Sequence, residues 1–425
     1  MSRPAPRRAA LVNLGCRVNR VELDSMATRL EAAGFVLTGE ADADYIVINT
    51  CAVTGEAEAK TRKAIRHAAA RPQEPLVVAT GCVASLFADE LAALSPNVRV
   101  VANKREVADF VISLADANPA GLGEAEACAP VHSSVTPTGR TRPGVQVQDG
   151  CDNRCTYCII WKARGKARSF DPEGIVDEVR AAMGRGAHEV VLTGINLGDY
   201  RWGSGEGRMR LPGLLSLLLE RTGVERLRLS SIEPPDVTEE LVRLMAASDG
   251  RIAPFLHICL QSGCDDTLRR MARVYRTGLF RENVERAREA MSGIALGTDL
   301  IVGFPGETDE QFEESLAFCE EMRFAKMHIF RYSRRPGTPA AEFDDQVPPQ
   351  VMAERSRRAH ELAARMRSQE AARLVGKRDL VVVQYPGRAV SGGLFDVEVD
   401  PSIPTDTLMP VVFGGVRADG TLVAR

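Results

Sequence analysis

The chain has 425 residues, and its 54 basic and 57 acidic side chains give a formal net charge of −3. This length predicts two or three domains, and the balanced charge excludes a nucleic-acid partner held by a global positive field. No run of about 18 apolar residues occurs, and the apolar run before Asn13 is too short for a signal peptide. We therefore expect a cytoplasmic protein whose ten cysteines are metal ligands or free thiols, not disulfides.

Residues 1–115 have the pattern of a parallel α/β domain. Four apolar runs predict strands, at 9–16, 44–51, 75–82 and 98–103. Helix-like stretches such as 20–34 separate them. Residues 116–143 are rich in Gly, Pro, Ala and Ser without an apolar period, and they predict a linker that contains Cys128.

Six strand–helix units follow this linker and predict a partial (β/α)6 barrel, which completes the α/β fold class. The strands are predicted at 144–148, 189–194, 226–232, 255–261, 296–303 and 324–333. Two helix starts support this, because Asp171 precedes Pro172, and Thr308 or Asp309 can cap the helix after the fifth strand. The carboxyl ends of these strands are polar, glycine-rich or basic, so one mouth of the barrel is the predicted active site.

The last part of the chain changes composition twice. A helix-like run at 350–378 carries eight Lys and Arg residues against only Glu354, Glu361 and Glu370. Short β-rich runs after it, broken by Gly and Pro, predict a small β barrel. We therefore expect a barrel core with its basic helix at 144–375, and a small, β-rich, RNA-binding domain at 376–425.

One loop after the first barrel strand contains Cys151, Cys155 and Cys158. This spacing lets three thiolates bind three irons of a [4Fe–4S] cluster and leaves the fourth iron open to another ligand. A structural zinc site would need four ligands, and a redox dithiol would need only two. Zinc and redox chemistry therefore stay open as alternatives that suit the spacing less well.

Three further cysteines, Cys16, Cys51 and Cys82, each end a predicted strand of the first domain. Neighbouring parallel strands end at one edge of a sheet, so we expect the three thiols to meet there. The alternative is three small buried apolar side chains, but the polar and turn residues after each cysteine favour ligands. The remaining cysteines are interpreted as packing residues or left without a role: Cys128, Cys259, Cys319 and Cys264.

The loop CDNRCTYC resembles the cysteine signature of the radical S-adenosylmethionine enzymes. In that family the open iron binds the methionine part of the cofactor, and an electron from the cluster releases a 5′-deoxyadenosyl radical. The resemblance places Tyr157 near the adenine and the LTGIN segment around Gly194 near the methionyl amino group. It assigns the rest of the cofactor surface to Glu233, Gln261 and Gly303; for the two glycines, a turn or packing role is the alternative.

A more specific resemblance covers nearly the whole chain. The motifs LGCRVN, NTCAVT, TGCVA, SSIEP, LQSGCDDTLRRM, DLIVGFPGET and YSRRPGTPAA are similar to those of the radical S-adenosylmethionine methylthiotransferases. The likeness is greatest to the members that methylthiolate N6-threonylcarbamoyladenosine beside the tRNA anticodon. The sequence departs from the family at Trp161, Cys259 and Cys264, and its tail matches the family's RNA-binding barrel poorly.

The resemblance implies two [4Fe–4S] clusters and S-adenosylmethionine as cofactors. Sulfide at the open iron of the Cys16, Cys51 and Cys82 cluster is methylated by one S-adenosylmethionine. A second one, on the Cys151, Cys155 and Cys158 cluster, gives the radical that removes a hydrogen from the adenine ring. The implied partners are a tRNA anticodon stem-loop and an electron donor such as flavodoxin or ferredoxin, with no membrane.

Two basic segments are candidates for substrate contacts. The run Lys162, Arg164, Lys166 and Arg168 is expected to hold phosphates, with a solvated loop as the alternative. The threonylcarbamoyl group carries a carboxylate, and the planar fork of arginine suits a carboxylate. The candidates for that contact follow the sixth strand: Arg331, Arg334 and Arg335.

Three alternative functions stay open. A methylthiotransferase acting on isopentenyladenosine in tRNA would use the same clusters but needs no cation for its apolar group. A methylthiotransferase acting on an aspartate of a ribosomal protein would not need the basic helix at 355–378. A non-catalytic iron–sulfur or zinc RNA-binding protein would leave the second cysteine trio without a purpose.

Overall fold

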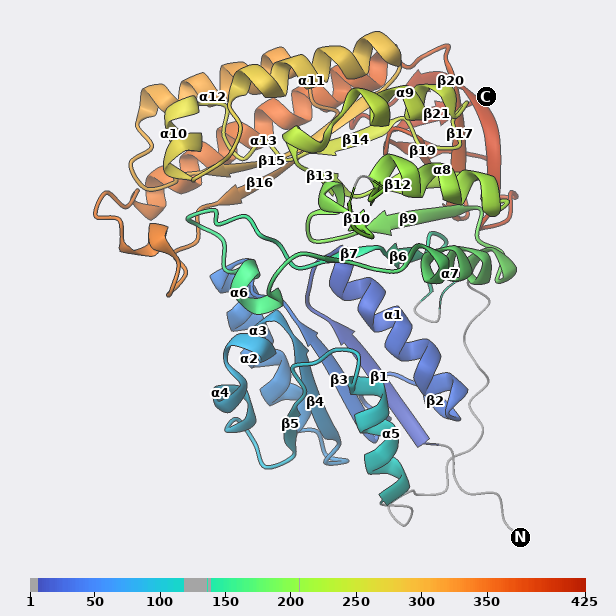
Figure 1. Cartoon of the computed structure of the whole chain (residues 1–425), viewed down its shortest axis with the longest axis vertical. Coiled ribbons are helices and arrows are strands. Elements are labelled where there is room, and N and C mark those ends of the chain that lie inside the picture. Colours follow the sequence, from blue (N-terminus) through green and yellow to red (C-terminus); the bar gives the residue numbers. More distant parts are fainter. Residues whose placement is uncertain (1–6, 118–135, 137–138, 206) are drawn as a thin grey trace. The chain divides into compact units, whose positions relative to one another are not determined.

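The computed structural model describes residues 7–117, 136, 139–205 and 207–425 (Figure 1). The described chain forms two compact units, of which the first contains the residues up to Gly139 together with Ile159–Lys166. The second contains Arg140–Cys158 and Ala167–Arg425. The predicted boundaries at 115, 143 and 375 remain predictions, and Cys128 lies outside the described residues.

The first unit is built on a five-stranded parallel sheet with the order β2-β1-β3-β4-β5. Its strands are β1 (Arg7–Asn13), β2 (Phe35–Leu37), β3 (Tyr45–Thr50), β4 (Leu76–Gly81) and β5 (Val98–Val100). The four predicted strands are present. The fifth, β2, is a three-residue edge strand that was not predicted.

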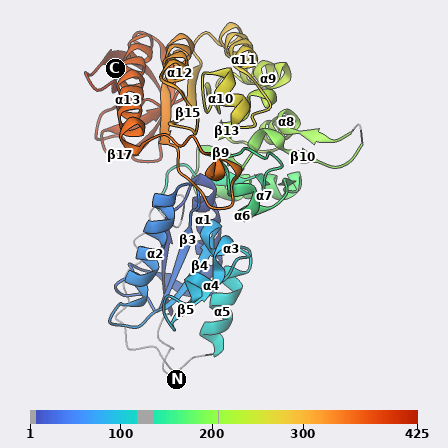
Figure 2. The same cartoon turned by 90° about the vertical axis from the view of Figure 1, so that its left-hand side faces the viewer.

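Helices cover both faces of this sheet (Figure 2). On one face, α1 (Arg17–Ala32) and α5 (Val107–Ala117) pack on Ala9, Val47 and Val78. On the other face, α2 (Gly55–Ala69), α3 (Cys82–Leu86) and α4 (Ala88–Ala92) pack on the opposite side chains of the same strands. The short helix α6 (Ile160–Arg164) joins this second layer, where Ile159 is buried.

The second unit contains all six predicted barrel strands, and every pairing between neighbours is parallel. The hydrogen-bonded ladder is interrupted at the third strand, which is divided into β12, paired with β9, and β13, paired with β14. The strands are β6 (Gly144–Gln146), β9 (Glu189–Thr193), β12 (Arg226–Leu229), β13 (Ser231–Ile232), β14 (Phe255–Ile258), β15 (Ala295–Val302) and β16 (Lys326–Arg331).

The helices between these strands begin where the sequence predicts. Asp171 accepts a hydrogen bond from the backbone N–H of Gly174, with Pro172 at the first helical position. Thr308 and Gln311 form a reciprocal capping box. The helices are α7 (Pro172–Gly184), α8 (Leu211–Arg221), α9 (Glu239–Ala247), α10 (Asp265–Arg270), α11 (Thr277–Ala290) and α12 (Asp309–Met322).

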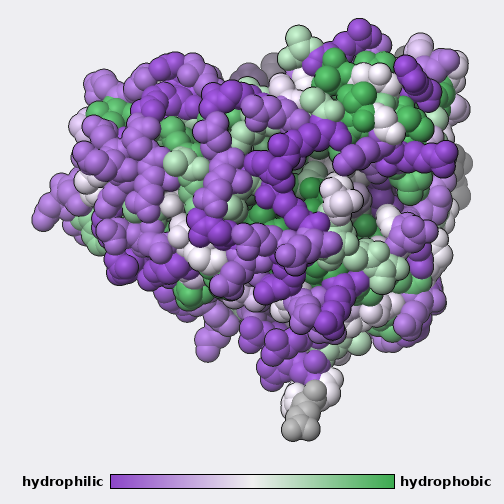
Figure 3. All heavy atoms as spheres, turned by 90° about the horizontal axis from the view of Figure 1, so that it is seen from above, coloured by the Kyte–Doolittle hydropathy of each residue, from purple (hydrophilic) through white to green (hydrophobic). Residues whose placement is uncertain are grey.

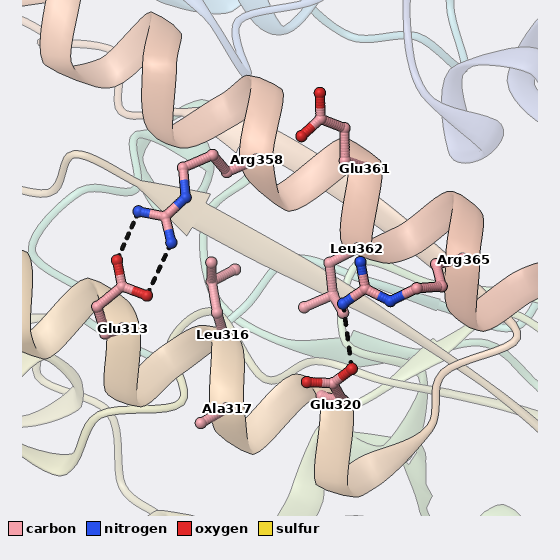
Figure 4. Close-up of a pocket in the computed structure, with 8 residues that line it drawn as sticks. All are labelled: Glu313, Leu316, Ala317, Glu320, Arg358, Glu361, Leu362 and Arg365. Carbon is pink, nitrogen blue, oxygen red and sulfur yellow. Dashed lines mark hydrogen bonds and ion pairs between the residues drawn. The ribbon is translucent and has the colours of Figure 1, made fainter.

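The basic helix is α13 (Pro349–Ala372), and acidic side chains of neighbouring segments match its charges. Arg358 and Arg365 extend across a shallow groove to Glu313 and Glu320 of α12 (Figure 4). Arg355 is buried and bonds the Glu307 carboxylate at 2.8 Å. The molecular face seen in Figure 3 is mostly hydrophilic, and no helix of the described chain is long and apolar enough to cross a membrane.

The C-terminal residues form the predicted small barrel, which is closed in the order β17-β18-β19-β21-β20. Its core continues into the amino ends of β14 and β15 through Phe255 and Ala295. The strands are β17 (Arg378–Tyr385), β18 (Arg388–Ser391), β19 (Asp396–Glu398), β20 (Leu408–Val416) and β21 (Leu422–Ala424). The small barrel therefore packs on the amino ends of the large barrel's strands, away from the mouth at their carboxyl ends.

A buried charge network fixes this packing. Glu189, at the start of β9, accepts hydrogen bonds from Arg226 and Arg228 of β12, and all three side chains are fully buried. Arg226 also donates to the Leu380 carbonyl at 2.6 Å, and Arg228 to the Gly392 carbonyl at 2.7 Å. A strand of the large barrel is thereby bonded to the backbone of the small one.

Candidate functional site

The structure brings Cys16, Cys51 and Cys82 to the carboxyl edge of the first sheet. The three strands concerned are adjacent, and their ends are level, because Asn13 pairs with Asn49 and Thr50 pairs with Gly81. Cys16 is the N-cap residue of α1, Cys51 follows β3 and Cys82 begins α3. Residues far apart in the sequence thus present three thiols along one sheet edge.

The surroundings of these thiols suit a soft metal centre. Burial raises the pKa of Cys51 to about 11, and the neighbouring Cys16 and Cys82 thiols add to the rise. Burial also raises the pKa of Cys16, while the charge of Arg164 opposes that rise. Cys51 and Cys82 are buried and Cys16 is exposed. A thiol with a raised pKa needs a cation to become a thiolate, and iron supplies one. Three sulfurs on one sheet edge therefore fit a cluster with one open iron.

The second cysteine set lies in a loop that two hydrogen bonds to backbone carbonyls hold in place. The Thr156 N–H donates to the Met271 carbonyl at 3.1 Å, and the Thr156 hydroxyl donates to the Arg270 carbonyl at 2.9 Å. The loop turns back on itself, since the Cys158 N–H donates to the Cys155 carbonyl at 3.1 Å. Burial raises the pKa of Cys151 to about 11, so this donor set, too, fits a cationic cluster.

Arg273 is a site residue that the sequence analysis missed. Its Nη1 donates to Cys155 Sγ at 3.0 Å, its Nη2 pairs with Glu233, and its Nε donates to the Tyr275 hydroxyl at 3.0 Å. The side chain is buried, so a fixed positive charge stands beside the cysteine loop. The only signal in the sequence is an arginine between two helix patterns, which is too common to indicate a function.

Tyr157 lies beside Phe304, and Gly303 lies beside Met352. The Tyr157 ring lies edge-on to Phe304 with centroids 6.5 Å apart. Gly303 has φ +72°, and a Cβ there would lie 2.2 Å from Met352 Cγ, so only glycine fits. Its N–H donates to the Glu307 carboxylate at 2.6 Å. Gly303 therefore has a packing role, and its cofactor role stays a prediction.

Gln261 and Gly194 occupy two other strand ends. Gln261 has φ +68°, a strained value for a residue with a side chain, and its N–H donates to the Asp299 carbonyl at 2.8 Å. A Cβ on Gly194 would lie 2.9 Å from Gln148 Oε1, an oxygen that also accepts from the Asn196 N–H. Gly194 therefore keeps the LTGIN turn close to the first barrel strand.

A cluster of His257, Asp299 and His328 also escaped the sequence analysis. One Asp299 oxygen lies 3.1 Å from a ring nitrogen of each histidine, and the two rings stack with centroids 5.1 Å apart. Burial alone would raise the pKa of Asp299, but the two imidazoles hold it well below its usual range. The ligand atoms of the three residues lie within 4.8 Å of one another, so this group can hold a metal ion as well as form a hydrogen-bonded unit.

The three candidate substrate arginines lie in different environments. Arg331 is exposed at the end of β16. Arg334 is exposed as well, and its Nε donates to the Ala341 carbonyl at 2.6 Å. Arg335 is buried. The structure therefore leaves the side chains of Arg331 and Arg334 more accessible than that of Arg335.

The basic run after Cys158 is divided by the fold. Arg164 is turned inward, with 1% of its side chain exposed, and it pairs with Glu22 at 2.8 Å. Arg168 pairs with Asp149. Lys162 and Lys166 are exposed. The expectation that this run holds phosphates therefore does not apply to Arg164, which a phosphate cannot reach.

Comparisons with known proteins agree with this architecture. Residues 145–319 match the model of the radical SAM superfamily, and residues 8–103 match that of the uncharacterized protein family UPF0004. In fold, the chain resembles the radical S-adenosylmethionine methyltransferase TsrM from Kitasatospora setae, with a TM-score of 0.54 and 17% identity over 79% of this chain and 77% of that one.

Curated relatives match over most of their length. The chain is 36% identical to the threonylcarbamoyladenosine tRNA methylthiotransferase MtaB of Chlamydia pneumoniae, over 97% of this chain and 96% of the relative. It is 37% identical to the MtaB of Thermotoga maritima, over 87% and 85%. It is also 37% identical to the tRNA-2-methylthio-N(6)-dimethylallyladenosine synthase of Thermobifida fusca, over 88% and 77%. The chain belongs to the radical S-adenosylmethionine methylthiotransferase family.

Proposed function

We propose that this chain converts N6-threonylcarbamoyladenosine beside the tRNA anticodon to its 2-methylthio derivative. The observation that carries the proposal is the match over 96% of a relative with that named activity, combined with two cysteine trios at strand ends. Each trio suits one [4Fe–4S] cluster: Cys16, Cys51 and Cys82 in the first unit, and Cys151, Cys155 and Cys158 in the second. The enzyme works in the cytoplasm.

When bound, the clusters and S-adenosylmethionine supply the radical that removes a ring hydrogen and the sulfur that replaces it. The protein supplies position and charge. We assign the cofactor surface to Tyr157, Gly194, Glu233, Gln261 and Gly303, as the family resemblance implies. To these we add Arg273, whose guanidinium group suits the cofactor's carboxylate and which already pairs with Glu233.

The threonylcarbamoyl group is the part of the substrate that sets the choice of tRNA. Its carboxylate needs a cation, and we place this contact at Arg331, Arg334 and Arg335. Arg331 ends β16 and Arg334 follows it, and both are exposed, whereas Arg335 is buried. The partners are the anticodon stem-loop of tRNA and an electron donor such as flavodoxin or ferredoxin. The small C-terminal barrel is a candidate for a further RNA contact.

Neither identity nor relative length separates this substrate from dimethylallyladenosine. Relatives named for either substrate reach 37% identity. The chain covers 85% and 96% of two relatives named for threonylcarbamoyladenosine, but 78% of a third, the MtaB of Bacillus subtilis, against 77% of the Thermobifida fusca synthase. The choice of threonylcarbamoyladenosine rests on the match over nearly the full length of one such relative and on the exposed arginines Arg331 and Arg334.

Mass spectrometry of tRNA nucleosides from cells with and without this gene tests the proposal. We expect 2-methylthio-threonylcarbamoyladenosine to disappear and its unmethylthiolated precursor to accumulate when the gene is deleted. Reconstituted enzyme should then restore the product on tRNA from the deletion strain. Methylthiolation only of dimethylallyladenosine, or only of an aspartate in a ribosomal protein, would overturn the substrate assignment.

A further inference from the structure

We call the loop that contains Cys151, Cys155 and Cys158 the radical loop. This loop belongs to the second unit, but the eight residues that follow its last cysteine belong to the first. Ile159–Lys166 lie within the first unit, where Ile159 and Ile160 pack in the layer formed by α2, α3 and α4. Helix α6 begins directly after Ile159 and ends at Arg164. The fold thereby carries one arginine of the radical-loop sequence into the interior of the N-terminal unit.

Arg164 reaches the N-terminal cysteines through Asn19. The Asn19 amide oxygen accepts hydrogen bonds from Arg164 Nη2 at 3.0 Å and from Cys16 Sγ at 3.2 Å. The Asn19 amide nitrogen donates to Asn49 Oδ1 and to the Thr50 carbonyl, both at 2.8 Å. Asn19 is fully buried and bonds at both ends, so Arg164 helps to fix the residue that orients Cys16.

A second cation, Lys104, shares the carboxylate partner of Arg164. Arg164 pairs with Glu22 at 2.8 Å, and Lys104 also pairs with Glu22 at 3.2 Å. One carboxylate thus faces two cations. An arginine stays charged in any environment found in proteins, and a buried charge interacts strongly because little water screens it. Three thiolates gathered nearby need such a charge, since two of them, at Cys51 and Cys82, are buried.

We propose that Arg164 is a positioning and charge-compensating residue for the cluster held by Cys16, Cys51 and Cys82. The inference rests on the proposed function, because it requires a cluster at those three cysteines. Arg164 holds the Asn19 side chain beside Cys16, and its charge favours both the thiolate form of Cys16 and the reduced, more negative state of the cluster. One loop of the sequence therefore serves both clusters, with cysteines for one and a cation for the other.

The test uses the full chain with Cys151, Cys155 and Cys158 replaced by Ala, so that only the N-terminal cluster forms. The readouts are bound iron per chain and the midpoint potential from an EPR-monitored redox titration. Arg164→Met should shift the reduction equilibrium about tenfold toward the oxidised cluster, which corresponds to about 59 mV for one electron. Lys162→Met, on the exposed side of the same helix, is the matched control and should leave the potential unchanged.

A second variant separates charge from general damage. Glu22→Gln removes the negative charge that faces Arg164 and should shift the midpoint potential toward the reduced cluster. The double variant Arg164→Met, Glu22→Gln should have a midpoint potential close to that of the parent chain. Arg164→Lys should leave the midpoint potential close to that of the parent chain, because lysine keeps the positive charge. Absence of iron from the parent chain would contradict the two-cluster function itself.

Two results would overturn the role of Arg164 and leave the two-cluster function standing. One is a normal iron content with a potential in Arg164→Met equal to that of the Lys162→Met control. The other is a loss of iron in Arg164→Met that neither Arg164→Lys nor the added Glu22→Gln restores. Restoration of iron by either change would instead support the proposal, since both restore the charge balance at the cluster.

Discussion

Arg273 Nη1 lies 3.0 Å from Cys155 Sγ, so a buried guanidinium group contacts the central cysteine of the radical loop. The same side chain pairs with Glu233, which comes from another strand end. A single arginine thus joins the cysteine loop to a second wall of the mouth. The contact also gives this mouth a fixed cation, which suits a carboxylate ligand.

Replacing Arg273 with Met should lower the rate of S-adenosylmethionine cleavage. Hydrogen bonds to charged groups contribute about 1.5–3 kcal/mol, so we expect a loss of roughly 10- to 100-fold in 5′-deoxyadenosine formation. Iron content should stay near normal, because all six cysteines remain. Arg269→Met is a suitable control, since Arg269 is exposed and pairs with Asp266 on its own helix. Equal effects of the two changes would remove Arg273 from the site.

The two cysteine trios should be separable in function. Cys155→Ala should remove about half of the bound iron and abolish 5′-deoxyadenosine formation, because it disrupts the radical cluster. Cys51→Ala should also halve the iron, yet leave cofactor cleavage measurable while the methylthiolated product disappears. Iron analysis combined with chromatography of both products measures this. Full iron and full product in Cys51→Ala would refute a second cluster.

Replacing His328 should lower the yield of methylthiolated product more than the rate of S-adenosylmethionine cleavage. Asp299, the hydrogen-bond partner of His328, has its Oδ2 3.9 Å from Cys259 Sγ. The charges of Glu233 and Cys155 add to the rise that burial causes in the pKa of Cys259. We expect His328→Phe, which keeps the stacking on His257 but loses the hydrogen bond, to lower product yield about tenfold at a similar rate of 5′-deoxyadenosine formation. Met327→Leu, on the other face of β16, should change neither. A parallel loss of both products would indicate a structural role.

Glu189 should make stability depend on pH. Burial alone would raise the pKa of Glu189, but Arg228 and Arg226 hold it well below its usual range. A carboxylate with a lowered pKa stabilises the fold above its unfolded pKa of about 4.3, and this stability is lost as the pH falls through the folded pKa. Glu189→Gln should therefore destabilise the chain by about 3–5 kcal/mol at pH 7.

Thermal unfolding at a series of pH values measures the Glu189 effect. The difference in stability between Glu189→Gln and the unchanged chain should narrow progressively as the pH falls below about 4.3, where the unfolded chain takes up a proton first, and it should close only below the folded pKa. Glu225→Gln is the matched control, because Glu225 is exposed and pairs with His188. A gap independent of pH throughout the acid range would show that charge at Glu189 does not stabilise the fold.

Most of the fold could be predicted because apolar runs mark buried parallel strands. The convergence of Cys16, Cys51 and Cys82 could also be predicted, since it follows from one rule about strand ends. His257, Asp299 and His328 could not, because their meeting depends on the register of three strands, and each residue alone looks like ordinary strand sequence.

Charges were the least predictable feature. The sequence shows the basic residues of α13 but not the carboxylates of Glu307, Glu313 and Glu320 that pair with them across the fold. A charge run on one element indicates a binding surface only when neighbouring elements leave it unpaired. The same holds for Arg164, which looks like part of a solvated basic loop until Glu22 is found beside it.

The interleaving of Ile159–Lys166 with the N-terminal unit limits how this protein can be recombined. A chimaera that exchanges the N-terminal domain with a relative at the 116–143 segment would separate α6 from the surface that it evolved to fit. Its junctions would join a foreign α3 layer to native Ile159 and Ile160. A workable exchange has to transplant two separate pieces of sequence, the N-terminal domain and the eight residues after Cys158, as one structural module.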